Sequence, residues 1–344
     1  MLFPYRYINH TMEKMQEFID YIFYEVWCKA PGTEYDLSLF NDKPELREVI
    51  TNFHYTEPKG AEFFTKGIHK IFNIFKQLEE DDIIQLQKWY AANNNIEKLC
   101  QNDPSVIPGH YEVLKQLNPE LSHHLKDFFT KLYSNEFLSK KALSSVIGHI
   151  AHHYKEFVKI NNKGKCPYCG ISDIDGEYVH TREAYDHFIP KSKYPFSTMN
   201  FKNLAPMCHK CNSDNKLRKD PLHDGNGNRR KAFYSYNSKT YKVDIKISLT
   251  SNDIEHLSPD DITITFGPPD LSEELNTWND LFEIEERYKA KCCTDCKWWI
   301  EQLMWKGETD IFPTILRSAE NYPYTDMNFL KKPFLEECKA KKIV

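Results

Sequence analysis

An acid and an imidazole stand side by side in the stretch YDHFIPKSKYP, which runs from Tyr185 to Pro195. Neighbouring side chains on a regular strand point to opposite faces, so Asp186 and His187 can serve one reaction centre only where the chain bends. Pro190 favours a bend, because it cannot continue a central strand and it pushes Ile189 towards extended backbone. An imidazole titrates near neutral pH and suits proton transfer, whereas a carboxylate suits a hard cation. The alternative is a solvated loop pair without a chemical role.

Four cysteines close to this stretch have the spacing of a metal site. They read C-x2-C-x38-C-x2-C and are Cys166, Cys169, Cys208 and Cys211. Each pair can form a tight turn whose sulfurs meet one tetrahedral ion, and zinc is the usual ion. Gly170, directly after the first pair, suits the left-handed backbone of such a turn. Four buried structural thiols are the alternative, but two spaced pairs in one short segment favour zinc.

The two features form one ordered set. Asp186 and His187 are followed by Asn203 and then by the second cysteine pair, which leads directly into Asn212. This set, between residues 166 and 219, resembles the HNH (ββα-metal) endonucleases. It is most similar to the zinc-bound subgroup, in which two cysteine pairs brace the motif. Because the third position is an asparagine rather than a histidine, the chain resembles an HNN variant.

The resemblance implies a fold and a set of roles. A strand carries Asp186 and His187, a second strand lies near Asn203, and a helix opens at Asn212, which is also a good N-cap residue. His187 is then the general base, Asp186 and Asn212 hold a catalytic Mg²⁺ ion, and Asn203 holds the loop and orients His187. An amide oxygen in place of an imidazole favours Mg²⁺, or Mn²⁺, over softer metals. The reaction implied is phosphodiester hydrolysis that leaves a 5′-phosphate and a 3′-hydroxyl.

Basic residues are concentrated around this motif. The formal net charge of the chain is −5, whereas residues 188–232 carry ten basic and three acidic residues and are therefore at +7. A local basic block attracts a phosphate backbone. The candidate nucleic-acid contacts are Lys191, Lys193, Lys210 and Lys216. A merely solvated charged face is the alternative for the first three.

The segments on either side of the motif must position it. Before it, apolar residues recur at three- and four-residue intervals in MEKMQEFIDYIFYEVW, GAEFFTKGIHKIFNIFKQL, DDIIQLQKWYAA and LSKKALSSVIGHIAHHYKEFVKI, which predicts helices. After it, TYKVDIKISLT alternates as a half-buried strand, DITITF is its candidate partner, and helical spacing resumes with Ser272 as N-cap. We therefore expect an α+β chain in three parts: a helical region for targeting or partner contacts (1–160), an HNH nuclease domain with a four-cysteine zinc site (161–235), and a strand pair followed by C-terminal helices (236–344).

The absence of a run of about 18 apolar residues, and of a signal-peptide pattern, predicts a cytoplasmic protein without a membrane partner. The leading functional hypothesis is a Mg²⁺-dependent endonuclease that cuts DNA. One alternative is a zinc-braced nucleic-acid-binding module that has lost its cutting activity. Another is an assembly subunit that is active only with a partner. The size and layout resemble nucleases of bacterial anti-phage defence systems of the Septu and retron types, in which the partner is an ATPase.

Overall fold

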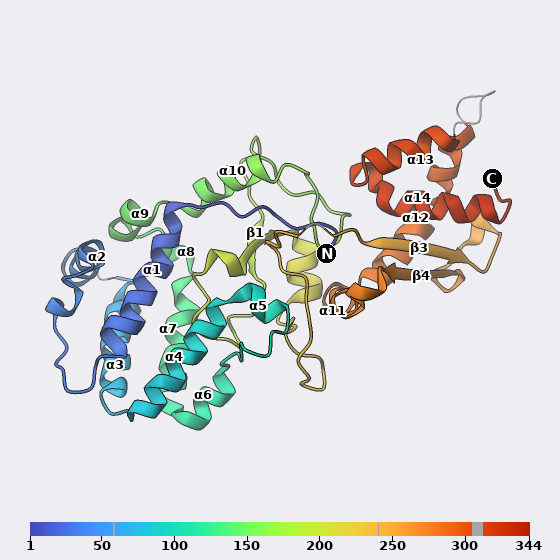
Figure 1. The fold of residues 1–344 in the computed structure, drawn as a ribbon. Coiled ribbons are helices and arrows are strands. Elements are labelled where there is room, and N and C mark those ends of the chain that lie inside the picture. Colours follow the sequence, from blue (N-terminus) through green and yellow to red (C-terminus); the bar gives the residue numbers. More distant parts are fainter. Residues whose placement is uncertain (58, 240, 305–311) are drawn as a thin grey trace.

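The N-terminal part of the chain is helical. The computed structural model describes residues 1–57, 59–239, 241–304 and 312–344 (Figure 1). Its first elements are η1 (Thr11–Glu13), α1 (Lys14–Tyr21), the π-helix η2 (Ile22–Trp27), η3 (Leu37–Phe40), α2 (Pro44–Tyr55), α3 (Glu62–Phe75), α4 (Glu80–Asn94), α5 (Ile96–Cys100), α6 (Tyr111–Leu117), α7 (Pro119–Leu132), α8 (Asn135–Leu138), α9 (Lys141–Ile147) and α10 (Ile150–Ile160). The helical pattern predicted for this region is therefore confirmed.

Helices α3 and α7 illustrate how the apolar spacing produces the core. The α3 side chains Phe64 and Ile71 are fully buried, and the Phe64 ring stacks on Phe128 of α7 with 5.6 Å between the ring centroids. Helix α7 starts at Pro119, whose fixed φ suits the first helical position. The preceding Asn118 side chain accepts a hydrogen bond from the Leu121 backbone N–H and so caps the helix.

The long periodic run before the motif divides into two helices. Gly148, at φ 79°, separates α9 from α10, and glycine adopts this left-handed region without the steric cost that a Cβ would impose. A Cβ at this position would also lie 3.0 Å from the Thr11 hydroxyl oxygen. That hydroxyl donates to the carbonyl of Ile147 at 3.1 Å, so the break lets the N-terminal segment pack against the end of α9.

The central part carries the candidate site on little regular structure. Strands β1 (Ala184–His187) and β2 (Leu204–Met207) form an antiparallel pair in which His187 lies opposite Leu204 and Asp186 opposite Ala205. Two short helices accompany them, η4 (Phe201–Asn203) before β2 and the π-helix η5 (Lys210–Lys216) after it. The two strands expected around the motif are thus present.

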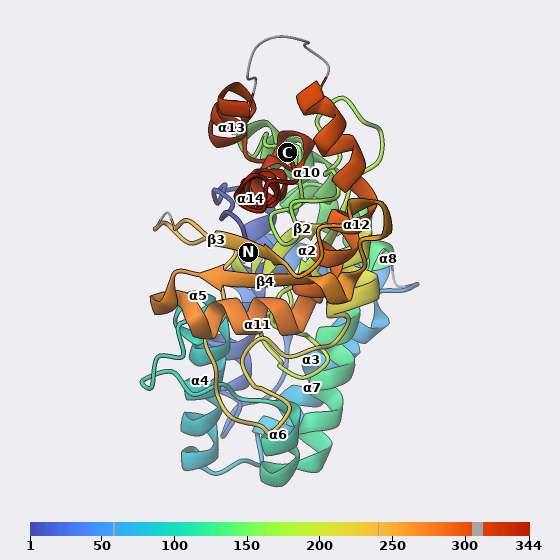
Figure 2. The same cartoon turned by 90° about the vertical axis from the view of Figure 1, so that its right-hand side faces the viewer.

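A second hairpin and further helices form the C-terminal part. The elements are β3 (Asp244–Leu249), η6 (Ile254–His256), η7 (Pro259–Asp261), β4 (Ile262–Gly267), η8 (Pro269–Leu271), α11 (Ser272–Phe282), α12 (Ile284–Met304), α13 (Phe312–Asn321), η9 (Thr325–Met327) and α14 (Asn328–Ala340). Strands β3 and β4 pair antiparallel, and Figure 2 shows them between α14 and α11.

Two details of the C-terminal prediction need correction. The strand expected from Thr240 begins only at Asp244, and Thr240 itself lies outside the described residues. Ser272 is the first residue of α11 rather than its N-cap, because the preceding Leu271 still belongs to the short helix η8. The paired strands themselves are confirmed, as is the mixture of helices and strands.

The three segments pack against one another. The backbone N–H of Leu2 donates to the carbonyl of Pro167 at 2.8 Å, and that of Tyr5 donates to the carbonyl of Ser235 at 2.8 Å. The N-terminal residues therefore lie against the central part, and the Tyr5 ring also meets Phe157 of α10 edge-on, with 4.8 Å between the centroids. Among the described helices, none combines the length and the apolar character that crossing a membrane requires.

Buried His153 in α10 makes the stability of this fold depend on pH. Its Nδ1 lies 2.5 Å from the Tyr185 hydroxyl, and burial, together with His10 and His152, lowers its pKa from 6.5 to about 3. Below pH 6.5 His153 binds a proton in the unfolded chain but stays neutral in the folded chain. The free energy of unfolding therefore decreases as the pH falls from 6.5 towards 3.

The variant His153→Gln keeps a polar group at this position and removes the titration. We expect the free energy of unfolding of the wild type to fall by about 2 kcal/mol more than that of the variant between pH 6.5 and pH 5, since one pKa unit corresponds to about 1.4 kcal/mol. Urea denaturation at both pH values measures the difference. An equal decrease in the free energy of unfolding of the two proteins would show that His153 does not cause the pH dependence.

Candidate functional site

The four cysteines of the sequence motif converge. The sulfurs of Cys166, Cys169, Cys208 and Cys211 all lie within 4.8 Å of one another, and all four residues are buried and free of disulfides. The sulfurs of Cys169 and Cys208 lie 3.9 Å apart. Four zinc–sulfur bonds of about 2.3 Å in a tetrahedron would place the sulfurs about 3.8 Å apart. The cluster therefore fits a metal ion such as zinc.

The first cysteine pair is shaped by the turn that was expected from Gly170. This residue adopts φ 68°, and its N–H donates to the carbonyl of Cys166 at 2.7 Å. A Cβ at Gly170 would lie 2.4 Å from a methyl group of Leu2 and 2.7 Å from the ring of Phe329. Glycine is thus required both by the backbone conformation and by the close approach of two other segments.

A cation supports the cysteine cluster from α12. The Arg287 guanidinium donates to the Cys211 sulfur over 3.4 Å. Burial works against its charge, but the sulfurs of Cys211 and Cys169 outweigh burial and raise the pKa of Arg287. A metal bound by four thiolates carries excess negative charge, which a neighbouring guanidinium compensates. No spacing in the sequence relates Arg287 to the cysteines, so sequence reasoning missed it.

His187 is held by a backbone carbonyl. Its Nε2 lies 3.0 Å from the carbonyl oxygen of Thr198, which can only accept, so Nε2 carries the proton and Nδ1 keeps its lone pair. Burial and the ammonium groups of Lys191 and Lys216 lower the pKa of His187 to about 3, although the bond to Thr198 opposes the shift. The half-buried ring also meets Tyr133 of α7 edge-on, with 4.8 Å between the centroids. His187 is therefore a neutral imidazole in one tautomer.

Asn203 closes the loop that follows His187. Its side-chain oxygen accepts from the N–H of Ile189 at 2.8 Å, and its amide nitrogen donates to the carbonyl of the same residue at 3.1 Å. The backbone adds a third link, because the N–H of Phe188 donates to the carbonyl of Asn203 at 2.9 Å. Thr198 lies within this loop, so the clasp also fixes the carbonyl that orients His187.

Asp186 forms a buried ion pair with Lys216. Its Oδ2 lies 2.9 Å from the Lys216 ammonium, whose side chain is 0% exposed. The two groups are poorly aligned for a hydrogen bond, so charge attraction holds them together. The ammonium donates instead to the carbonyl of His187 at 3.1 Å. Lys216 was expected to face phosphate, but in this structure it compensates the carboxylate that was expected to hold a cation.

Asn212 lies inside a helix rather than at its opening. Helix η5 begins at Lys210, its N-cap is His209, and the N–H of Asn212 already donates to the carbonyl of Cys208 at 3.0 Å. The expected N-cap role is wrong, because the second cysteine turn runs directly into the helix. Asn212 and Lys216 stand four residues apart on this helix, a spacing that places them on one face.

The basic block is largely neutralised within the chain. Six of its ten cations lie within ion-pair distance of carboxylates, in the pairs Lys193–Asp220, Lys210–Asp214, Lys216–Asp186, Lys219–Glu283, Arg230–Asp280 and Lys231–Glu273. Three of these pairs tie the central part to α11 or the residue that follows it. Lys191 donates to the carbonyl of Thr130. The local +7 charge therefore serves packing at least as much as it serves any phosphate backbone.

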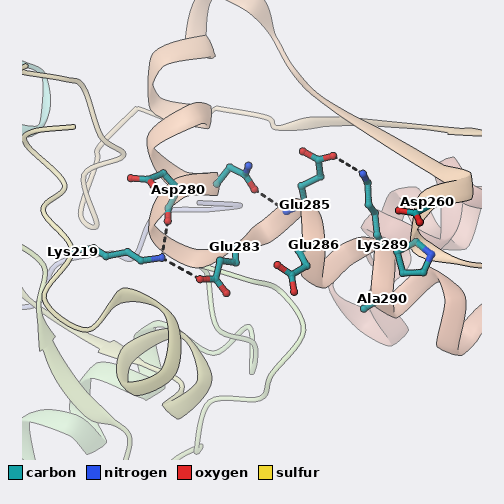
Figure 3. A pocket seen from close by; sticks show the side chains of 10 residues that line it. Lys219, Asp260, Asp280, Glu283, Glu285, Glu286, Lys289 and Ala290 are labelled. Atoms are coloured by element: carbon teal, nitrogen blue, oxygen red, sulfur yellow. Dashed lines mark hydrogen bonds and ion pairs between the residues drawn. The ribbon is translucent and has the colours of Figure 1, made fainter. Parts of the chain in front are cut away.

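A pocket of about 660 Å³ lies between Lys219, the end of α11 and the start of α12 (Figure 3). Carboxylates dominate its lining, and Lys219 reaches across to the carbonyl of Asp280 and the carboxylate of Glu283. None of the candidate site residues lines it. An acidic pocket disfavours phosphate, so it does not extend the candidate site.

No family model, curated protein or solved structure matches this chain. The assignment of chemistry to the site therefore depends on the residues and their geometry. The structure brings the four cysteines together and joins Lys216 to the Asp186 carboxylate and to the His187 carbonyl. Asn203 binds the next two residues of the chain, Phe188 and Ile189.

The metal centre predicts that the protein carries one zinc ion per chain. We expect Cys208→Ser to lose most of this zinc and to lower the urea midpoint, because three thiolates and a hydroxyl bind zinc more weakly. The matched control is Cys28→Ser, a half-buried cysteine outside the cluster. Elemental analysis of the purified proteins measures the metal content. A wild type without zinc, or equal zinc in both variants, would contradict the assignment.

The buried ion pair predicts strong coupling between its two partners. We expect Lys216→Met alone to destabilise the fold by about 3 kcal/mol, because it leaves a buried carboxylate without compensation. Adding Asp186→Asn should recover much of that loss, and a double-mutant cycle by urea denaturation measures the coupling. Additive effects of the two substitutions would show that the pair is not formed in solution.

Proposed function

We propose that this chain is an endonuclease of the HNH type, in its zinc-braced HNN form, which hydrolyses phosphodiester bonds of DNA. The observation that carries the proposal is the state of His187: Nε2–H donates to the Thr198 carbonyl, which leaves the lone pair on Nδ1. A neutral, oriented imidazole can accept a proton, but the burial that lowers its pKa to about 3 makes it a weak base in the described state. The ordered positions of Asp186, Asn203 and Asn212 around it support the same class.

In this proposal each residue of the site has one role in phosphodiester hydrolysis. Nδ1 of His187 takes a proton from a water molecule, whose oxygen attacks phosphorus while the bond to the 3′-oxygen breaks; this oxygen then takes a proton from solvent. Asp186 and Asn212 offer the oxygen ligands that would hold a Mg²⁺ ion, which when bound supplies charge neutralisation at the phosphate. Asn203 keeps the loop, and thereby His187, in place.

The ion pair between Lys216 and Asp186 favours a second form of the proposal. An ammonium at 2.9 Å competes with a cation for the same carboxylate, so the described state is one in which Asp186 is already compensated. An assembly subunit whose cutting begins only when a partner shifts η5 fits this observation. An ATPase of an anti-phage defence system is the partner that the layout of the chain suggests.

Loss of the general base should abolish cutting. With supercoiled plasmid and Mg²⁺, we expect wild-type protein to nick DNA and His187→Ala to be slower by at least about 100-fold, which is the lower range for general base catalysis. The matched control is His256→Ala, an exposed histidine between β3 and β4 that pairs with Asp253. Gel electrophoresis of a time course measures the rates.

The outcomes separate the competing functions. Equal nicking by wild type and His187→Ala would contradict the proposed reaction centre. Binding without nicking by both proteins would favour a nucleic-acid-binding module. Cutting that starts only when Lys216→Met is introduced, or when a partner protein is added, would favour the subunit that needs activation.

A further inference from the structure

A second pocket, of about 530 Å³, differs in charge from the acidic one. Its polar lining includes His110, His223 and Arg229, and no carboxylate is among the described residues that line it. Two stretches far apart in sequence build it, the segment around Pro108 and the turn after Asp220. An isolated antiparallel bridge pairs His223 with Arg229, so their backbones are held side by side.

A chain of hydrogen bonds fixes the orientation of His223. The Tyr194 hydroxyl donates its single proton to Oδ2 of Asp220 at 2.7 Å, so towards Nδ1 of His223, 2.8 Å away, it can only accept. Nδ1 therefore carries a proton. The carboxylate of Asp220 also lies 3.5 Å from Nδ1. Nε2, on the opposite side of the ring, takes no part in the chain.

Arg229 brings a positive charge that faces backbone carbonyls instead of a carboxylate. Its two terminal nitrogens donate to the carbonyls of Val106 at 3.2 Å and of Leu99 at 3.4 Å. Its Nε is buried and has no hydrogen-bond partner, and within the described ranges no carboxylate lies at ion-pair distance from the guanidinium. A guanidinium has five N–H donors, so several stay available.

We propose that this pocket is a binding site for a phosphate group, held by Arg229 together with the imidazoles of His110 and His223. A guanidinium and two imidazoles around a cavity without carboxylates in its described lining match the charge and the hydrogen-bonding needs of an oxyanion. The proposal does not depend on nuclease activity. Tyr194, however, belongs to the loop that Asn203 closes, so a phosphate in this pocket would adjoin the element that orients His187.

Titration with inorganic phosphate tests the site directly. Imidazole resonances of His110 and His223 are followed by NMR in the full chain with its metal, and the exposed His256 serves as the internal reference. We expect saturable shifts for the first two. Arg229→Gln should weaken phosphate binding by at least about tenfold, as expected for a hydrogen bond to a charged group. The matched control Arg218→Gln, an exposed cation of the same basic block, should bind like the wild type.

A second variant and a second ligand complete the test. Thermal unfolding verifies that Arg229→Gln is folded; if it is not, His110→Gln, which changes another hydrogen-bonding group of the same lining, takes its place with the same expectation. Oligonucleotides with and without a 5′-phosphate are then tested for competition with inorganic phosphate. Competition by the phosphorylated form alone would show that the pocket binds the terminal phosphate of a nucleic acid. Competition by neither form would show that it binds free phosphate. Absent or linear shifts at both histidines, or equal binding by the Arg229 and Arg218 variants, would overturn the proposal.

Discussion

The convergence of four sulfurs within 4.8 Å is the constraint on which the rest of the central region depends. This region has two four-residue strands and short helices of its own, so regular structure alone cannot hold it. Cys208 follows β2 directly and Cys211 lies in η5, so an ion bound there fixes the angle between strand and helix. That angle brings Lys216 to Asp186 and to the His187 carbonyl. A metal ion held there would add order to a region whose apolar side chains, such as Phe188, Phe196 and Leu204, are already buried in the core.

Ion pairing within the chain is the second constraint, and it involves most of the basic residues between positions 188 and 232. Several of their carboxylate partners lie on α11, and Lys216 is buried against Asp186. A buried ion pair contributes little net stability but strongly penalises the loss of either partner, so it specifies one arrangement of the site. Arg229 makes no ion pair within 4.0 Å among the described residues, although the Asp220 carboxylate acts on its charge from farther away, and it lines a cavity.

The sequence predicted those features that depend on spacing alone. The two cysteine pairs, the left-handed turn at Gly170 and the helices before residue 160 follow from local patterns, whereas the strands on either side of the loop were expected from the resemblance to the HNH motif. The position of Asn212 inside η5 was not predictable, because the cysteine turn continues into the helix instead of ending before it. Arg287 and Tyr133 reach the site from distant segments, and a single sequence gives no signal for such contacts. The Thr198 carbonyl lies in the loop after His187, but only the path of that loop shows that it meets the imidazole. The partner of Lys216 could be known only once η5 was placed against β1.

X-ray absorption spectroscopy at the zinc edge tests the central constraint most directly, because it measures the ligands of the metal in solution without crystals or activity. The account predicts a first shell of four sulfur atoms at about 2.3 Å and no nitrogen or oxygen ligand. A first shell that contains nitrogen or oxygen, or fewer than four sulfurs, would contradict it, since the cysteines could not then fix β2 against η5.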